Sequence, residues 1–281
     1  MNAFPFILGA AALLPLYLTF PGHAGKDKRA PFLGRNIAHR GLYAKDQSVP
    51  ENSLPAFRRA IEYGYGIELD VQLTRDERLI VFHDDKAYRM CGNEKRIDEI
   101  AFEELSALRL ANTDEKVPEF TEVLRLIDGK APLIIEIKSG KRNALTCRKT
   151  LDALRNYKGE YCIESFDPRV VSFIRFHAPK ILRGGLAQPA NDYVESGMPR
   201  AAGFILGNML MNFISRPQFI AYKIGKKPFL VRLASSFGAM KVAWTAHDAE
   251  SEGENDTVIF EHFTPETRFE RCPRDAKRKK S

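Results

Sequence analysis

Cysteine is scarce in this sequence, and its four cysteines stand far apart. Cys91, Cys147, Cys162 and Cys272 form no C-x-x-C pair. Their spacing therefore supports neither a disulfide framework nor a cysteine-based zinc site. Reduced thiols in the cytoplasm are the simplest interpretation.

The sequence also lacks low-complexity tracts and internal repeats. Of its 281 residues, 44% are hydrophobic and 28% are charged. This composition is ordinary for a globular protein and excludes disorder as the main description. A single α/β barrel needs about 250 residues, so one barrel with short extensions fits the length.

The body of the chain lacks an excess of charge of either sign. The net charge is +7, but residues 1–35 carry +3 and residues 268–281 carry +5, which leaves −1 for the rest. A nucleic-acid-binding domain carries its basic residues on the folded part, so the distribution argues against nucleic acid as a partner. The basic ends indicate an anionic membrane surface instead, with a solvated, disordered tail as the alternative.

The first 25 residues contain no charged side chain. Ala3 to Phe20 is an almost unbroken apolar run, and about 18 apolar residues can just cross a bilayer as a helix. Pro5 and Pro15 would kink or shorten that helix. A secretory signal normally begins with basic residues, whereas here the basic cluster follows the run. We therefore expect an uncleaved membrane anchor with the following domain in the cytoplasm. The alternatives are a secreted protein cleaved near Gly22-His23-Ala24 and a buried helix.

Short apolar strands alternate with amphipathic helical stretches from residue 36 onward. This alternation predicts a parallel sheet covered by helices. Residues 187–218 have no legible pattern. The strands are expected at 37–38, 67–73, 79–82, 133–138, 161–165, 181–186, 219–222, 242–245 and 258–260, and the helices at 53–63, 102–108, 119–127, 143–157 and 168–177.

Two of the expected strands place acidic residues on one face. In residues 67–71, Glu68 and Asp70 alternate with aliphatic residues, and in residues 135–138 Glu136 and Lys138 do the same. If the aliphatic face packs under the helices, the carboxylates point into the barrel or toward its rim. Three carboxylates there would repel one another without a cation, and oxygen ligands favour Mg²⁺ or Ca²⁺ over zinc. The alternative for one such acid is an ion pair, for example with Lys138.

Two histidines stand directly after expected strands. His39 follows the first strand and His83 follows the strand at 79–82. Catalytic residues of TIM barrels come from the carboxyl ends of strands, and a histidine pair can act as general base and general acid. Arg40 adds a planar cation that suits a phosphate. The other four histidines, His23, His177, His247 and His262, are interpreted as structural.

The same residues carry a resemblance to a known family. The chain resembles the glycerophosphodiester phosphodiesterases over about residues 36–265, and each motif is weak alone but the ordered series is specific. The motifs are Ala38-His-Arg-Gly41, Pro50-Glu-Asn-Ser53, Gly66-Ile-Glu-Leu-Asp-Val71, Val81-Phe-His-Asp84, Val117-Pro-x-Phe-x-Glu-Val-Leu124, Glu136-Ile-Lys138, Glu164-Ser-Phe-Asp-Pro168, Ala243-Trp-Thr245 and Val258-Ile-Phe-Glu261.

The resemblance implies a TIM (β/α)8 barrel that holds a divalent metal, Mg²⁺ or Ca²⁺. It implies metal ligation by Glu68, Asp70 and Glu136, an acid–base pair of His39 and His83, and phosphate binding by Arg40 and Lys138. It places Glu51 behind the metal or Arg40, and it places Phe166 and Trp244 in the substrate pocket, for which core packing is the alternative. His247 stands where the family more usually has asparagine, so the leaving-group pocket departs from the family pattern.

The sequence therefore predicts four segments. These are a hydrophobic anchor or signal at 1–25, a basic linker at 26–35, a barrel domain at 36–267 and a basic tail at 268–281. The expected reaction, from the resemblance, is hydrolysis of glycerophosphodiesters to sn-glycerol 3-phosphate and an alcohol. The alternatives are a lysophospholipase D that acts on membrane lysolipids and a catalytically inactive, membrane-bound scaffold.

Overall fold

The computed structural model describes residues 13–270. Its strands are β1 (Arg35–Ala38), β2 (Gly66–Leu73), β3 (Leu79–Val81), β4 (Leu133–Ile137), β5 (Tyr161–Ser165), β6 (Leu182–Ala187), β7 (Phe219–Lys223), β8 (Met240–Ala246) and β9 (Thr257–Phe260). Its longer helices are α3 (Leu54–Glu62), α6 (Phe120–Ile127), α7 (Asn143–Leu154), α8 (Pro168–His177), α10 (Arg200–Gly207) and α12 (Phe229–Ser236). Shorter helical segments are α2 (Lys26–Arg29), α4 (Tyr88–Cys91), η1 (Ile97–Glu99), α5 (Phe102–Ser106), α9 (Ala190–Glu195), α11 (Asn212–Ser215) and η2 (Glu250–Glu254).

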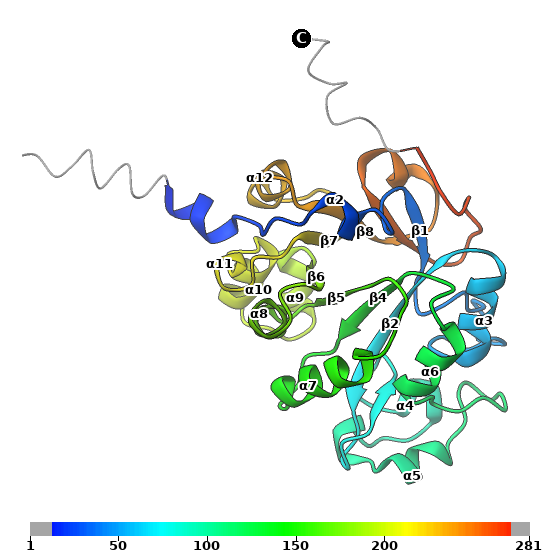
Figure 1. The fold of residues 1–281 in the computed structure, drawn as a ribbon. Coiled ribbons are helices and arrows are strands. Elements are labelled where there is room, and N and C mark those ends of the chain that lie inside the picture. The colour runs from blue at the N-terminus through cyan, green and yellow to red at the C-terminus, as the bar shows by residue number, and fades with distance from the viewer. Residues whose placement is uncertain (1–12, 271–281) are drawn as a thin grey trace, which may run out of the picture.

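Within residues 13–270, eight parallel strands close into a barrel, as predicted (Figure 1). Their order is β1-β9-β8-β7-β6-β5-β4-β2, and β2 pairs with β1 to complete the ring. At this closure Ile37 lies opposite Gly66, and Ala38 lies opposite Ile67. A Cβ on residue 66 would collide with the Ile37 side chain, so glycine lets the first and second strands approach.

The predicted strand at 79–82 exists as β3, but it lies outside the barrel. It pairs antiparallel with β2, with Val81 opposite Val71. Residue periodicity reports which face a side chain occupies and not the direction of a strand, so the sequence could not exclude β3 from the parallel set.

Two apolar layers hold the barrel together. On the outside, Ile67, Leu69 and Val71 of β2 pack with Phe57 of α3 and Phe120 of α6. Inside, at the end where the strands begin, a second cluster is covered by the segment around α2; its largest members are Phe32, Ile37, Ile134, Phe219 and Met240. The alternation predicted for residues 67–71 is therefore correct, and it leaves Glu68 and Asp70 on the inner face.

The stretch for which the sequence gave no pattern contains α9, α10 and α11. The helices α9 and α10 pack closely because α10 carries small residues at the contact. A Cβ on Gly203 or Gly207 would lie 2.8 Å from a backbone atom of Ala190. This close approach depends on tertiary contacts, which residue periodicity does not reveal.

Of the anchor expected at residues 1–25, the structure describes only residues 13–25. No helix within residues 13–270 combines the length and the apolar character needed to cross a bilayer. Residues 1–12 of the predicted anchor, and residues 271–281 of the predicted basic tail, lie outside the described part of the chain. The helical part that is described, residues 13–19, is short.

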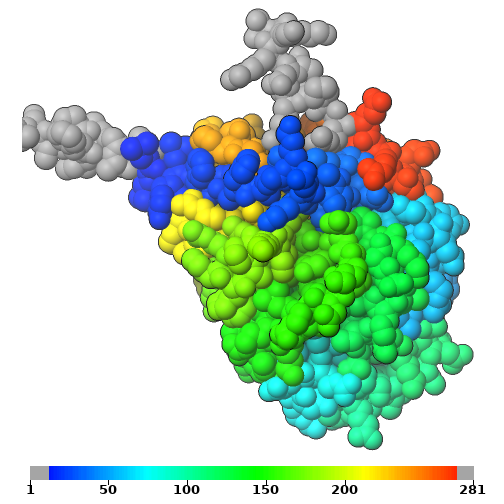
Figure 2. Space-filling view, in the orientation of Figure 1, coloured from blue at the N-terminus to red at the C-terminus, as the bar shows by residue number. Residues whose placement is uncertain are grey.

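Residues 17–24 contact the end of the barrel where the strands begin. Figure 2 shows the N-terminal residues, in blue, against the yellow and orange parts of the chain. Arg216 donates hydrogen bonds to the carbonyl oxygens of Tyr17 and Phe20, at 3.0 and 2.8 Å. The Gly22 amide donates to the carbonyl oxygen of Pro217 at 2.9 Å. Arg216 and Pro217 directly precede β7, so the apolar run enters the fold at the base of the barrel.

Candidate active site

A cavity of about 430 Å³ lies where the parallel strands end. Small-molecule sites commonly measure ~300–1,000 Å³, and those of TIM barrels lie at this end. Its walls come from the ends of several strands and from the loop after β3. Its lining includes His39, Arg40, Glu51, Glu68, His83, Glu136, Glu164, Phe166, Trp244 and Glu261.

A cluster of carboxylates forms the floor of this cavity. Asp70 of β2 lies opposite Glu136 of β4. Glu68, Asp70 and Glu136 each offer an oxygen atom, and these three atoms lie within 4.8 Å of one another. Their side chains are buried, with residue exposures of 3%, 1% and 6%. The structure therefore brings together the three acids that the strand alternation places on one face.

Burial and mutual repulsion oppose the ionisation of this cluster. Burial raises the pKa of Glu68 well above its ordinary value, and the nearby Asp70 and Glu136 raise it further. Burial also raises the pKa of Glu136, against the opposing effect of Lys138. For Asp70 the burial cost is outweighed by Lys138, His83 and Arg40, which lower its pKa. Of these three acids, Asp70 is therefore the one whose pKa the neighbouring cations lower.

Lys138 lies beside the carboxylates rather than in the cavity wall. Its Nζ is 3.0 Å from Glu136 Oε1 and 3.3 Å from Asp70 Oδ1. Lys138 is absent from the residues that line the cavity, although the sequence predicts a phosphate contact for it. In this arrangement its ammonium group offsets part of the negative charge of Asp70 and Glu136.

The donor set fits a hard divalent cation. Glu164 Oε2 is buried and accepts no hydrogen bond from any described residue, and Asp70 Oδ1 has the Lys138 ammonium group 3.3 Å away but no hydrogen bond of good geometry. Buried carboxylate oxygens without donors are costly, and oxygen ligands of this kind are those that Mg²⁺ and Ca²⁺ prefer. Glu68, Asp70 and Glu136 could therefore hold such an ion.

Glu164 is a fourth acid of this site, and the sequence reasoning gave it no role. It lies on β5 directly opposite Glu136 and is 1% exposed. Burial raises the pKa of Glu164 well above its ordinary value, and Glu136 and Asp70 add to the effect. The motif Glu164-Ser-Phe-Asp-Pro168 contained the signal, since its acid has the same strand position as Glu136.

We expect Glu164→Gln to stabilise the metal-free protein in a pH-dependent way. Because the folded-state pKa is raised, the glutamate destabilises the fold progressively as pH rises above the unfolded value near 4.3, and has no such effect below it. In EDTA at pH 8 the variant should gain roughly 1–3 kcal/mol in unfolding free energy, the usual cost of an uncompensated buried group. At pH 4 the gain should vanish.

Denaturant unfolding at the two pH values measures this gain. The matched control is Glu160→Gln, because Glu160 is exposed just before β5. A Glu164→Gln protein no more stable than the parent at pH 8 would show that the acid is compensated in the fold.

His39 is held by a carboxylate at the end of the first strand. Its Nδ1 donates a hydrogen bond to Glu261 Oε2 at 2.7 Å, and its Nε2 lies 3.9 Å from Glu68 Oε2. Tyr43 donates a second hydrogen bond to the same oxygen of Glu261, also at 2.7 Å. Burial lowers the pKa of His39, although Glu261 opposes this. The neutral imidazole therefore carries its proton on Nδ1 and leaves Nε2 as an acceptor.

His83 has a parallel arrangement on the other side of the cluster. Its Nδ1 donates to Asp84 Oδ1 at 2.7 Å. Arg89 of α4 bridges Asp84 and Glu51, with its Nε 2.6 Å from Asp84 Oδ2 and its Nη2 2.6 Å from Glu51 Oε1. The second histidine is thus fixed by a network that includes a residue of α4.

Glu51 also holds Arg40, which is one of the two contacts that the resemblance implies for it. Arg40 Nη1 is 2.7 Å from Glu51 Oε1, while Arg40 Nε is buried 3.7 Å from Asp70 Oδ2 and has no hydrogen-bond partner among the described residues. The Arg40 amide donates to Glu68 Oε2 at 2.9 Å. A buried N–H without a partner in a cavity is a candidate donor to a ligand.

Phe166 and Trp244 both line the cavity, as the resemblance implies. Their rings lie edge to face with centroids 5.5 Å apart. They are partly buried and pack against the inner apolar cluster, so each ring belongs both to the core packing and to the cavity wall.

The sequence reasoning missed the residues that orient the histidines. Glu261, Asp84, Arg89 and Tyr43 received no role. For Asp84 a local signal existed, because it directly follows His83. Glu261 is 222 positions away from His39, so no spacing in the sequence links the two.

The chain resembles known proteins over most of the barrel. Residues 39–262 match the glycerophosphoryl diester phosphodiesterase family. A glycerophosphodiester phosphodiesterase of Caldanaerobacter subterraneus subsp. tengcongensis is 37% identical over 163 residues, which are 54% of this chain and 66% of that protein. A lysophospholipase D of Rattus norvegicus is 28% identical over 159 residues, which are 52% of this chain and 49% of that protein. The chain therefore spans about half to two thirds of the length of these two curated relatives.

A solved structure shares the fold. A phosphodiesterase of Oleispira antarctica, in complex with the product sn-glycerol-3-phosphate, has a TM-score of 0.64 and 21% sequence identity. The similarity covers 81% of this chain and 93% of that chain. At this identity the similarity concerns the barrel fold alone.

Proposed function

The chain belongs to the glycerophosphoryl diester phosphodiesterase family, and on that premise we propose that it hydrolyses glycerophosphodiesters to sn-glycerol 3-phosphate and an alcohol. The observation that carries this proposal is the arrangement of His39 and His83 around one acidic cavity. Each imidazole is oriented through Nδ1 by its own carboxylate, at 2.7 Å. The bacterial relative of 37% identity, a glycerophosphodiester phosphodiesterase, supports the same reaction.

Positive charge next to the phosphoryl oxygens, which neutralises their negative charge, is the first requirement of this reaction. Glu68, Asp70 and Glu136 would hold a divalent cation, Mg²⁺ or Ca²⁺, which supplies that charge when it is bound. Arg40 faces the same cavity, and its unpartnered Nε–H can donate to a phosphoryl oxygen. Glu51 holds the guanidinium of Arg40 in place through Nη1. Lys138 forms ion pairs with Asp70 and Glu136, and its contact with the phosphate stays a prediction from the family resemblance.

Proton transfer is the second requirement, and the two histidines supply it. With Nδ1–H donated to Glu261 or Asp84, Nε2 of each imidazole is the atom that gains or loses a proton. One Nε2 accepts the proton of the attacking hydroxyl, and the other donates a proton to the oxygen of the departing alcohol. The family resemblance makes the glycerol hydroxyl the attacking group. A cyclic phosphate then forms as the alcohol leaves, and water opens that ring in a second step.

A lysophospholipase D reaction is the second candidate. It uses the same chemistry on a glycerophosphodiester that carries an acyl chain. An apolar wall of the cavity, formed by Phe166, Leu186, Trp244 and Ile259, favours it. The rat relative, a lysophospholipase D of 28% identity, supports the same alternative.

Membrane attachment with a cytoplasmic barrel stays a prediction from the sequence. The uncharged first 25 residues and the basic residues after them support it. Flotation of the full-length chain with anionic and neutral liposomes tests it, and a chain that stays at the bottom of the gradient with both would contradict it.

The proposed reaction is tested on the full-length protein with defined substrates. Glycerophosphocholine, glycerophosphoethanolamine and lysophosphatidylcholine micelles are each incubated with Mg²⁺, Ca²⁺ or EDTA. We expect metal-dependent release of glycerol 3-phosphate from the first two and none in EDTA. Hydrolysis of the lysolipid alone would favour the second candidate. A folded protein inactive on all three substrates would favour the inactive scaffold.

A further inference from the structure

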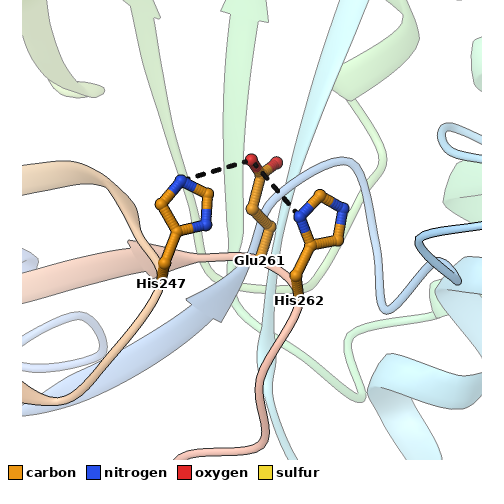
Figure 3. A group of neighbouring side chains, drawn as sticks. All are labelled: His247, Glu261 and His262. Atoms are coloured by element: carbon orange, nitrogen blue, oxygen red, sulfur yellow. Dashed lines mark ion pairs between the residues drawn. The ribbon is translucent and has the colours of Figure 1, made fainter.

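A second group of metal-binding side chains lies at the rim of the cavity. His247 follows β8, and Glu261 and His262 follow β9 (Figure 3). One donor atom from each of the three lies within 4.8 Å of the others. His247 Nε2 and His262 Nδ1 are both 3.8 Å from the same atom, Glu261 Oε1. The sequence reasoning had interpreted both histidines as structural.

The carboxylate of Glu261 is held so that one oxygen remains available. Its Oε2 accepts hydrogen bonds from His39 Nδ1 and from the Tyr43 hydroxyl, both at 2.7 Å. Within the described residues, Oε1 accepts no hydrogen bond and faces the two histidines. Two fixed donors on one oxygen thus aim the other oxygen at the pair of imidazoles.

The two histidines are also positioned by ring contacts. The ring of Tyr43 lies edge-on to His262 at 5.2 Å between centroids. The rings of His247 and His262 lie nearly parallel, 14° apart in orientation and 6.0 Å between centroids. His247 is 62% exposed as a side chain, so an ion can reach the group from solvent.

Two imidazoles and one carboxylate are donors of a different type from those of the acidic cluster. Zinc and similar transition ions favour this set and often keep a fourth position open, whereas three carboxylates suit Mg²⁺ or Ca²⁺. Zinc bonds of about 2.0–2.2 Å in a tetrahedral site place the donors roughly 3.3 Å apart. The two distances of 3.8 Å from the histidines to Glu261 Oε1 approach that value, and the third spacing, between the histidine nitrogens, lies within 4.8 Å. Side-chain rotations would close the difference.

We propose that His247, Glu261 and His262 bind a transition-metal ion of the zinc type, at a site separate from the acidic cluster. His39 lies between the two sites, with Nδ1 on Glu261 and Nε2 3.9 Å from Glu68. The ion acts on the established cavity through this link, because it fixes the carboxylate that orients His39. The chain thereby holds two metals of different chemistry.

Cobalt titration of the full-length protein tests this site without an activity measurement. After treatment with a chelator and dialysis, the protein is saturated with Mg²⁺ and titrated with Co²⁺. Visible absorption reports the ion environment, and equilibrium dialysis with metal analysis reports the stoichiometry. We expect one Co²⁺ per chain with a tetrahedral or five-coordinate spectrum, displaced by Zn²⁺.

Variants assign the cobalt to the named residues. His247→Ala should weaken Co²⁺ binding at least tenfold, and His262→Gln should do the same if the first variant misfolds by circular dichroism. The matched control is His177→Ala, since His177 is exposed on α8 and stacks on Phe173 away from the cavity. No Co²⁺ uptake in the presence of Mg²⁺ would overturn the proposal. Uptake that both His247→Ala and His262→Gln leave unchanged would also overturn it.

Discussion

Replacement of either His39 or His83 by asparagine is expected to lower kcat/KM for glycerophosphocholine by about 10²–10⁴-fold, the usual contribution of a general acid or base. Asparagine keeps a polar group of similar size but cannot exchange a proton near neutral pH. Each histidine has its Nδ1 held at 2.7 Å by a carboxylate, so its loss removes a group that the fold has already oriented. Glycerol 3-phosphate release measures the effect, and circular dichroism verifies folding.

The double variant separates a concerted pair from two independent groups. If His39 and His83 act in one step, the double variant should be only slightly less active than the less active of the two single variants, because the groups act as a unit. The matched control, His177→Asn, should retain parental activity, since His177 stacks on Phe173 on the outside of the barrel. Parental activity in either active-site variant would exclude the two-histidine mechanism.

A substrate with a good leaving group distinguishes the two roles. From a glycerophosphodiester of 4-nitrophenol, the 4-nitrophenolate leaves without being protonated. The variant that lacks the general acid should therefore recover most of its rate on this substrate. The variant that lacks the general base should not recover. Equal recovery by both variants would contradict a division of labour between the histidines.

The second large effect is expected from Glu136→Gln. Glutamine has the shape of glutamate but carries no charge, so the variant loses one of three anionic ligands while the barrel keeps its packing. Removal of a residue that hydrogen-bonds to a metal ligand typically costs about 10–100-fold in metal affinity or activity, so the loss of a ligand itself should cost more. We therefore expect at least a 100-fold loss of activity at limiting Mg²⁺, partly recovered at high Mg²⁺.

Metal-induced stabilisation gives an independent measure for the same variant. Mg²⁺ or Ca²⁺ should raise the melting temperature of the parent protein, because binding to the folded state alone is stabilising, and should raise that of Glu136→Gln much less. The matched control is Glu119→Gln, since Glu119 pairs with Arg78 on the surface. Full activity of the parent protein in EDTA would exclude the metal-dependent mechanism.

The part of the site that lies on strands could be predicted from the sequence. In residues 67–71 and 135–138, acids alternate with aliphatic residues, and a period of two places side chains on opposite faces of a strand. Because parallel strands end together, the alternation also brought Asp70 and Glu136 to the same level, where they lie opposite each other. These inferences need only local geometry.

The missed features depend on contacts between distant parts of the chain. Glu261 reaches His39 only after the barrel has closed, and Arg89 reaches Glu51 from a helix outside the predicted pattern. The helices α9 and α10 pack closely at Gly203 and Gly207, a tertiary contact that periodicity could not reveal.

Residues 17–24 and the mouth of the cavity lie at opposite ends of the barrel. These residues meet the barrel next to Arg216 and Pro217, where the strands begin, whereas the cavity opens where the strands end. If a membrane holds the N-terminal segment, as the sequence predicts, the mouth of the cavity would point away from that membrane toward the aqueous phase. A lysolipid would then have to leave its bilayer before it could reach His39 and His83.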